Sequence, residues 1–217
     1  MREKPFLGAR DRSMRNLGEV RDRLRKFRKR RRDDLLYALA LFAVRLFRFL
    51  PLSLGIWIGG MVGGFAYFIL PRDRNRALEH LAIAFPSETS ALERRRIARK
   101  CFQNLGKNAV ELVNFPRLKG DLDRMITVEG RAFLDETLAR GKGLIWITGH
   151  LGNWELMACY FAQKGYPVRV IAREIDEERL NRLLLGFRNE SAVRVIQRDS
   201  ASSGRQMLRA LRDGEII

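Results

Sequence analysis

The chain has 217 residues, 46% of them hydrophobic, and its 42 Lys and Arg against 25 Asp and Glu give a formal net charge of +17. This length and composition exclude a disordered chain and suit one domain with an appendage. Two cysteines, Cys101 and Cys159, exclude a disulfide framework, and no Cys/His spacing predicts a metal site. The charge indicates an anionic partner, which nucleic acid, a phospholipid surface or a phosphorylated carrier would each satisfy.

Residues 1–34 form a basic arm that carries +8 of the net charge, with fourteen Lys and Arg against six Asp and Glu. Its run 28–32 has no apolar periodicity that would make a packed helix. Two interpretations remain open, a solvated arm and a polybasic stretch held against anionic lipid head groups.

Residues 35–70 are predominantly apolar, and 52–70 are nineteen residues without a charge. A helix of that length measures roughly 29 Å, about the thickness of a bilayer's hydrocarbon core. Basic residues on both flanks disfavour a single pass, so we expect a membrane-associated helix or helical hairpin bent near Pro51, or a helix lying in the interface. A buried core helix of a soluble protein remains the alternative. Small residues that would let another helix approach closely gather on one face: Gly59, Gly60, Gly63 and Gly64.

Residues 71–217 have the composition of an ordinary soluble domain. We expect a helix over 74–84 and a second over 91–114, which the capping-box pair Ser90 and Glu93 opens. Apolar positions of the second helix predict a buried stripe, in which Cys101 is a core residue: Ile97, Cys101, Leu105, Val110 and Leu112.

From residue 126 onward, strand-like and helical patterns alternate. Predicted strands cover 126–129, 144–148, 168–172 and 193–197, with a last one starting at 215, and predicted helices cover 132–139, 154–164, 177–189 and 204–212. Repeated βα units of this length predict an α/β fold with a mixed, largely parallel sheet flanked by helices. The chain stops two residues into the last predicted strand, so we expect the C-terminal part of the domain to be missing.

The segment 144–155 runs from a predicted buried strand, through a turn with Gly149 and Gly152, into a helix. His150 lies at the carboxyl end of that strand, where active sites of α/β sheets gather, and Glu155 follows in the first helical turn. A carboxylate bonded to one ring nitrogen would make the other a better general base toward a hydroxyl. The second histidine, His80, lies in an amphipathic stretch and is assigned no catalytic role.

The motif Gly-His150-Leu-Gly-Asn-Trp-Glu155 resembles the HX4D/E motif of membrane-associated glycerolipid acyltransferases, and most of all the bacterial late acyltransferases of lipid A biosynthesis. Supporting stretches extend the resemblance over residues 35–217, among them 74–86, the helix around 104–111, 141–143 and 208–214. The basic arm lies outside it. Composition and resemblance together divide the chain into a basic arm (1–34), a membrane-associated helix or helical hairpin (35–70) and a truncated acyltransferase domain of glycerolipid acyltransferase-like fold (71–217).

The resemblance implies an O-acyltransferase that moves a fatty acyl group to a hydroxyl of a lipid A precursor or of a related glycolipid or lysophospholipid. The donor would be a thioester of acyl carrier protein or coenzyme A, with no further cofactor and no metal. His150 would be the general base, oriented by Glu155, while Arg188 would stabilise the oxyanion and Arg173 would bind donor phosphate or acceptor charge. Gly149, Gly152 and Asn153 would shape the turn. The implied location is the cytoplasmic side of the bacterial inner membrane.

Two other classes of function remain as alternatives. A basic nucleic-acid-binding protein would use the charge, but the arm has only Phe6 and Phe27 to stack on bases, and the uncharged stretch 52–70 would have no purpose. We therefore expect an anionic membrane surface as partner and no nucleic acid. A catalytically inactive membrane scaffold is the second alternative.

Overall fold

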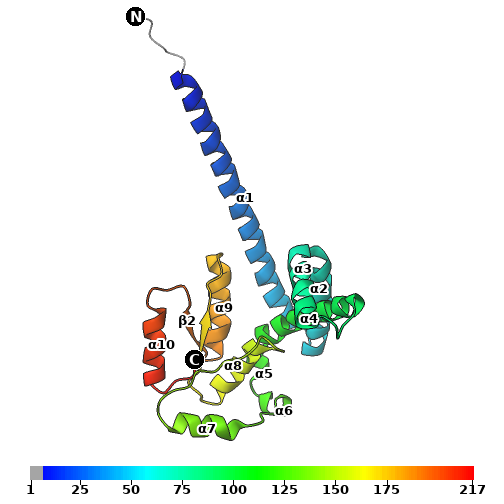
Figure 1. The fold of residues 1–217 in the computed structure, drawn as a ribbon, viewed down its shortest axis with the longest axis vertical. Coiled ribbons are helices and arrows are strands. Elements are labelled where there is room, and N and C mark those ends of the chain that lie inside the picture. The colour runs from blue at the N-terminus through cyan, green and yellow to red at the C-terminus, as the bar shows by residue number, and fades with distance from the viewer. Residues whose placement is uncertain (1–6) are drawn as a thin grey trace, which may run out of the picture. The chain divides into compact units, whose positions relative to one another are not determined.

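The computed structural model describes residues 7–217, with the side chains of Arg23, Arg25 and 27–217. Residues 1–6, the start of the predicted basic arm, lie outside the described residues. The chain divides into two compact units, Met1–Ala43 and Val44–Ile217. The fold is mostly helical with a small parallel sheet, which is consistent with an α/β class (Figure 1).

The described part of the basic arm is helical. Helix α1 (Leu7–Phe49) continues from the arm into the apolar segment without a break at residue 35. Arg and Lys have high helix propensity, so this segment can be helical without an apolar stripe. A stripe is needed only where a helix packs against the rest of the protein. The side chains of 27–32 are all exposed, as a solvated arm requires.

The apolar segment is broken where the sequence predicts a bend. Helix α1 ends at Phe49, and α2 (Leu52–Ile69) begins after Pro51, whose backbone is extended. Among the described residues, α2 is the one helix long and apolar enough to cross a membrane. Helix α3 (Pro71–Ala84) follows at once, with Pro71 in its first turn, and ends before the Phe85-Pro86 pair because a residue that precedes proline disfavours the helical region.

Helix α4 (Ala91–Val113) begins with the predicted capping box. The Ser90 hydroxyl accepts the backbone N–H of Glu93, and the Glu93 carboxylate accepts the backbone N–H of Ser90. The expected buried stripe is only partly formed, because α2 packs on a neighbouring face of α4, at Phe102, Gly106 and Val110. Val110 and Leu112 are buried, whereas Leu105 is half exposed and Cys101 is exposed. The assignment of Cys101 to the core is therefore wrong.

Glycines bring α2 and α4 into direct backbone contact (Figure 1). A Cβ atom on Gly59 would lie 2.7 Å from the carbonyl oxygen of Gly106, and one on Gly63 would overlap the carbonyl oxygen of Phe102. The face of α2 that carries the glycines is thus buried against α4 along its length. This is the close helix approach that the small residues predict.

Replacement of Gly63 by Ala should force α2 away from α4 and lower the free energy of unfolding by about 1–3 kcal/mol, the usual cost of overpacking. Gly60→Ala is the matched control on the same helix, because its Cβ would meet only the flexible end of Lys107, at 3.0 Å. Chemical denaturation of both variants in detergent measures the difference. Equal stability of the two variants would contradict the close approach.

The chain after α4 crosses the core in short helices before the sheet begins. Two single-turn helices, α5 (Phe115–Leu118) and α6 (Leu122–Met125), lead to an extended segment and to α7 (Arg131–Ala139). The strand predicted over 126–129 does not form, because no strand among residues 7–217 makes ladder hydrogen bonds with it. Strand propensity alone does not supply the hydrogen-bond partner that a strand needs.

The remaining helices alternate with short parallel strands. Helix α8 (Trp154–Gln163) precedes β1 (Arg169–Ala172), α9 (Glu178–Glu190) precedes β2 (Arg194–Gln197), and α10 (Ser203–Arg212) closes the pattern. The two strands pair in parallel, with Val170 opposite Val195. The predicted strands at 144–148 and 215 contribute only isolated bridges, in which Ile216 lies between Leu144 and Val168. The strands therefore pair in parallel, as the βα pattern predicts, but each strand is shorter than expected.

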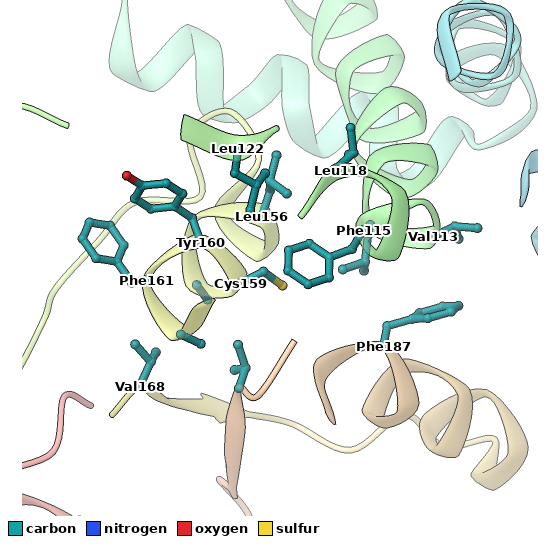
Figure 2. Close-up of a cluster of buried hydrophobic side chains, with 14 of the residues drawn as sticks. Val113, Phe115, Leu118, Leu122, Leu156, Cys159, Tyr160, Phe161, Val168 and Phe187 are labelled. Atoms are coloured by element: carbon teal, nitrogen blue, oxygen red, sulfur yellow. The ribbon is translucent and has the colours of Figure 1, made fainter. Parts of the chain in front are cut away.

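Helix α8 lies at the centre of the hydrophobic core, as Figure 2 shows. Phe115 from α5 points toward Cys159, and Val168 at the start of the sheet lies below the helix. Cys159 is fully buried, and its thiol donates a hydrogen bond to the Ser191 hydroxyl at 3.0 Å. Burial raises the pKa of the Cys159 thiol to about 11.

The two cysteines should therefore differ sharply toward maleimide at pH 8. Because the thiolate is the reactive form, a raised pKa should slow Cys159 at least ~100-fold relative to a free thiol, while the exposed Cys101 is labelled. Mass spectrometry of labelled peptides, before and after unfolding in denaturant, measures both rates. Comparable labelling of the two thiols in the folded protein would contradict this core.

Candidate functional site

The predicted catalytic turn connects the extended residues 144–146 to α8. Gly152 has φ +59°, a left-handed conformation that favours glycine, and it allows the chain to turn sharply into the helix. Asn153 caps α8, since its side-chain oxygen accepts the backbone N–H of Leu156 at 3.0 Å. Asn153 thus fixes the junction between the turn and α8, whereas Gly149 has no positive φ.

Two side chains of α4 hold this turn in place. The Asn108 amide donates to the carbonyl oxygen of Gly152 at 2.6 Å, and the Asn153 amide donates to the Glu111 carboxylate at 2.7 Å. Sequence reasoning did not assign a role to Asn108. The signal was its spacing of three from Glu111, which puts both side chains on one face of a helix. Because α4 also packs against α2, one helix supports both the turn and the apolar segment.

Glu155 forms a nearly buried ion pair with Arg188 of α9. The guanidinium donates to both carboxylate oxygens, at 3.0 Å from Nε and 2.5 Å from Nη2. Only 10% of the Arg188 side chain and 20% of the Glu155 side chain are exposed. The structure therefore brings together two predicted site residues that are 33 positions apart in the chain. The bidentate geometry matches the fixed fork of a guanidinium.

His150 is exposed at the surface of the turn and contacts Trp154, with 4.6 Å between the ring centroids. The expected hydrogen bond between His150 and Glu155 is not formed in the part of the chain that the structure describes. The carboxylate is directed to Arg188 instead, because both residues extend from helices that pack in the core while the imidazole projects from the turn. The His150 imidazole is therefore exposed to solvent.

Arg173 lies away from this pair. It follows β1 on the surface, its side chain is exposed, and its guanidinium lies 3.7 Å from the Asp199 carboxylate. Among the described interactions, none joins Arg173 to His150, Glu155 or Arg188. Its predicted contact with donor phosphate or acceptor charge stays a prediction.

An apolar cavity of about 530 Å³ adjoins the segment that leads to the turn. That volume is typical of sites for small organic ligands. Ile145, Trp146 and Ile147 line one side, and His150 follows three residues later. Further lining comes from α7, from α8 and from the extended segment before α7: Phe133, Leu134, Met157, Phe161, Ile126 and Val128.

Replacement of Asn108 by Ala should remove the support of the turn. The loss of one hydrogen bond costs about 1 kcal/mol of stability, and a displaced turn should lower turnover by up to about tenfold. Asn104→Ala is the matched control, one helical turn earlier on α4 with an exposed side chain. Steady-state acyl-transfer rates and melting curves test both variants, and equal turnover of the two would refute this support.

His150 and Glu155 thus stand at HX4E spacing, on a turn between an extended segment that bridges to Ile216 and helix α8. The family model of the bacterial lipid A biosynthesis acyltransferases matches residues 24–217. The chain therefore belongs to that family, which confirms the resemblance and makes the protein an acyltransferase. The match begins within the basic arm, so the expectation that the whole arm lies outside the resemblance is wrong for residues 24–34. Among curated proteins, no match to the chain was found.

Proposed function

We propose that this protein transfers a fatty acyl group from a thioester of acyl carrier protein or coenzyme A to a hydroxyl of a lipid A precursor or a related glycolipid or lysophospholipid. The observation that carries the proposal is the exposed His150 on a turn fixed by α4, in a chain of the lipid A acyltransferase family. No cofactor beyond the thioester co-substrate is required. We place the reaction at the cytoplasmic side of the bacterial inner membrane.

The proposed mechanism is direct transfer without an acyl-enzyme. His150 takes the proton of the acceptor hydroxyl as its oxygen attacks the thioester carbonyl. The new C–O bond forms, the negative charge passes to the carbonyl oxygen, and the C–S bond then breaks. The proton held by His150 goes to the leaving thiolate, so that one ester and one free thiol result.

Glu155 and Arg188 support this chemistry as a pair. The ion pair fixes the Glu155 carboxylate in the first turn of α8, directly after the turn that carries His150, and there the carboxylate would stabilise the imidazolium that forms during attack. A guanidinium has five N–H donors, and the pair uses two of them. The others can serve the oxyanion, together with backbone amides at the start of α8.

The apolar cavity is the proposed site of the acyl chain. Its lining is dominated by aliphatic and aromatic side chains, which suits a hydrocarbon tail. Residues 145–147 form part of its wall, so a chain in the cavity would have its thioester end near the turn. We expect the shape of this wall to influence the accepted chain length.

Acylation assays with the purified protein test the proposal. Saturated acyl thioesters of acyl carrier protein and of coenzyme A are supplied in parallel, and vesicles contain either a lipid A precursor or a lysophospholipid as acceptor. We expect transfer to at least one acceptor. The combination of thioester and lipid with the highest rate identifies the preferred donor and acceptor. Absence of transfer in every arm would reject the enzymatic function in favour of a membrane scaffold.

Sedimentation separates the membrane-bound enzyme from the nucleic-acid-binding alternative. A protein held in lipid by apolar side chains should stay in the membrane pellet at high salt. Binding to nucleic acid would instead be released, since it depends on phosphate contacts and counterions. Release by salt together with retention on DNA or RNA would contradict the proposed location.

A further inference from the structure

Helix α2 has two opposite faces of different character. Its glycine face is buried against α4, where Gly59 meets Gly106 and Gly63 meets Phe102. The opposite face exposes large apolar side chains over the whole helix, with 55–63% of each residue accessible at four of its positions: Trp57, Met61, Phe65 and Phe68. A soluble protein seldom leaves so continuous an apolar face uncovered, so this face requires a partner.

The register of α2 on α4 limits what that partner can be. Gly55 lies against Val110 near one end, and the Arg99 guanidinium lies 5.4 Å from the ring centre of Phe68 near the other. The two helices are therefore antiparallel and in contact along almost all of α2. Any movement of the docked α2 across a bilayer would carry the facing part of α4 with it.

That part of α4 is polar. Over 99–110 it carries Arg99, Lys100 and Lys107, besides amide side chains. Each such charge at a bilayer centre disfavours insertion by roughly a hundredfold. A spanning α2 would carry these charges into the bilayer with it, which disfavours a docked pair that crosses the membrane.

Cations lie beside the exposed face, which indicates an anionic lipid surface. The Arg99 guanidinium of α4 lies 5.4 Å from the ring centre of Phe68, which belongs to the exposed face, and Arg72 and Arg76 are exposed directly after α2. An apolar face with adjacent Arg residues is typical of helices that lie in the membrane interface. This charge complementarity favours a phospholipid surface over an apolar protein partner.

We propose that α2 lies in the plane of an anionic bilayer interface, with its glycine face on α4 and its Trp57, Met61, Phe65 and Phe68 face in the lipid, and does not span the membrane. This inference deepens the membrane location within the proposed function and rests on it. The catalytic turn, fixed to the same α4 by Asn108, is thereby held at the membrane surface, where a lipid hydroxyl can reach His150.

Depth measurements by spin labelling test the orientation. Labels are placed through Leu54→Cys, Met61→Cys and Phe68→Cys in a Cys101→Ser background; these sites are seven residues apart and share the exposed face. The full chain is bound to vesicles of phosphatidylethanolamine and phosphatidylglycerol, and collisions with oxygen and a nickel chelate give each depth. We expect three similar depths, about 5–10 Å into the head group and acyl boundary. Native Cys101, labelled alone, is exposed on α4 and should report water.

A spanning helix would give a different pattern and overturn the inference. Leu54 and Phe68 would then lie about 21 Å apart along the membrane normal, with Met61 near the bilayer centre. Labels that all report water would overturn it too. The depth of the labels is measured without acyl transfer, so the two proposals can fail separately. A spanning pattern in an active protein rejects only the in-plane orientation of α2. An in-plane pattern in a protein that is inactive on every acceptor rejects only the proposed function.

A pair of matched variants gives a second test. Phe65→Asp should weaken vesicle binding at least about tenfold, because a buried aromatic contact with lipid is replaced by a charge. Leu208→Asp makes the same kind of change at a similarly exposed apolar residue of α10 and should leave binding unchanged. Equal effects of the two substitutions would contradict an α2-specific membrane contact.

Discussion

Replacement of His150 by Ala should lower the rate of acyl transfer by about 10² to 10⁴, the range for loss of a general base. The imidazole is exposed on a turn whose backbone is held by Asn108 and whose following helix is capped by Asn153, so its removal costs only the contact with the Trp154 ring. Folding should be unaffected, and the loss should appear in turnover rather than in donor binding. Initial rates over a range of acyl thioester concentrations measure it.

His80→Ala is the matched control, because His80 is the second of two histidines and is exposed on α3. It should transfer acyl groups at the normal rate. A His150→Ala protein that retains normal turnover would reject His150 as the base. Equal losses in the two variants would show that the effect is not specific to the turn.

Breaking the Glu155–Arg188 pair should produce the largest loss of stability. Arg188→Met leaves a carboxylate that is largely removed from water without its partner, and Glu155→Gln leaves an uncompensated guanidinium. Loss of one partner of a buried ion pair costs about 3–5 kcal/mol, while loss of both removes the unpaired charge as well. The double variant should thus be more stable than the sum of the two single losses predicts, by about 1–3 kcal/mol.

Chemical denaturation of the four proteins in this cycle measures the coupling. The exposed pair Glu178 and Arg182 on α9 is the matched control, and the same substitutions there should give a coupling of only about 0.3–0.5 kcal/mol. Acyl transfer should remain low in the Glu155–Arg188 double variant even though its stability is partly restored. Additive losses at Glu155 and Arg188, or full activity of the double variant, would contradict a supporting role for the pair.

The helices were predictable because their signals are local. Ser90 and Glu93 fix the start of α4, Pro51 separates α1 from α2, and Pro86 ends α3. The strands were less predictable, because a strand needs a hydrogen-bonding partner elsewhere in the chain. The segment 126–129 has a strand-like pattern and no ladder, and 144–148 is reduced to a bridge at Leu144.

The site shows the same division between local and distant contacts. The spacing of His150, Gly152 and Glu155 predicted the turn from the sequence alone. The choice of Arg188 as the partner of Glu155 could not be derived, because it depends on how α8 and α9 pack. Cys101 illustrates the converse error, since a periodic apolar pattern does not reveal which part of a helix the rest of the protein covers.

Transfer to a hydroxyl with His150 as the base is tested most directly by mass spectrometry of complete reaction mixtures. Donor thioester, free thiol, free fatty acid and acylated acceptor are quantified together for the unmodified chain and for His150→Ala. We predict one acylated acceptor for each thiol released by the unmodified chain, and neither product above background with the variant. Release of free fatty acid without acylated acceptor, or equal acylation by the variant, would contradict this function.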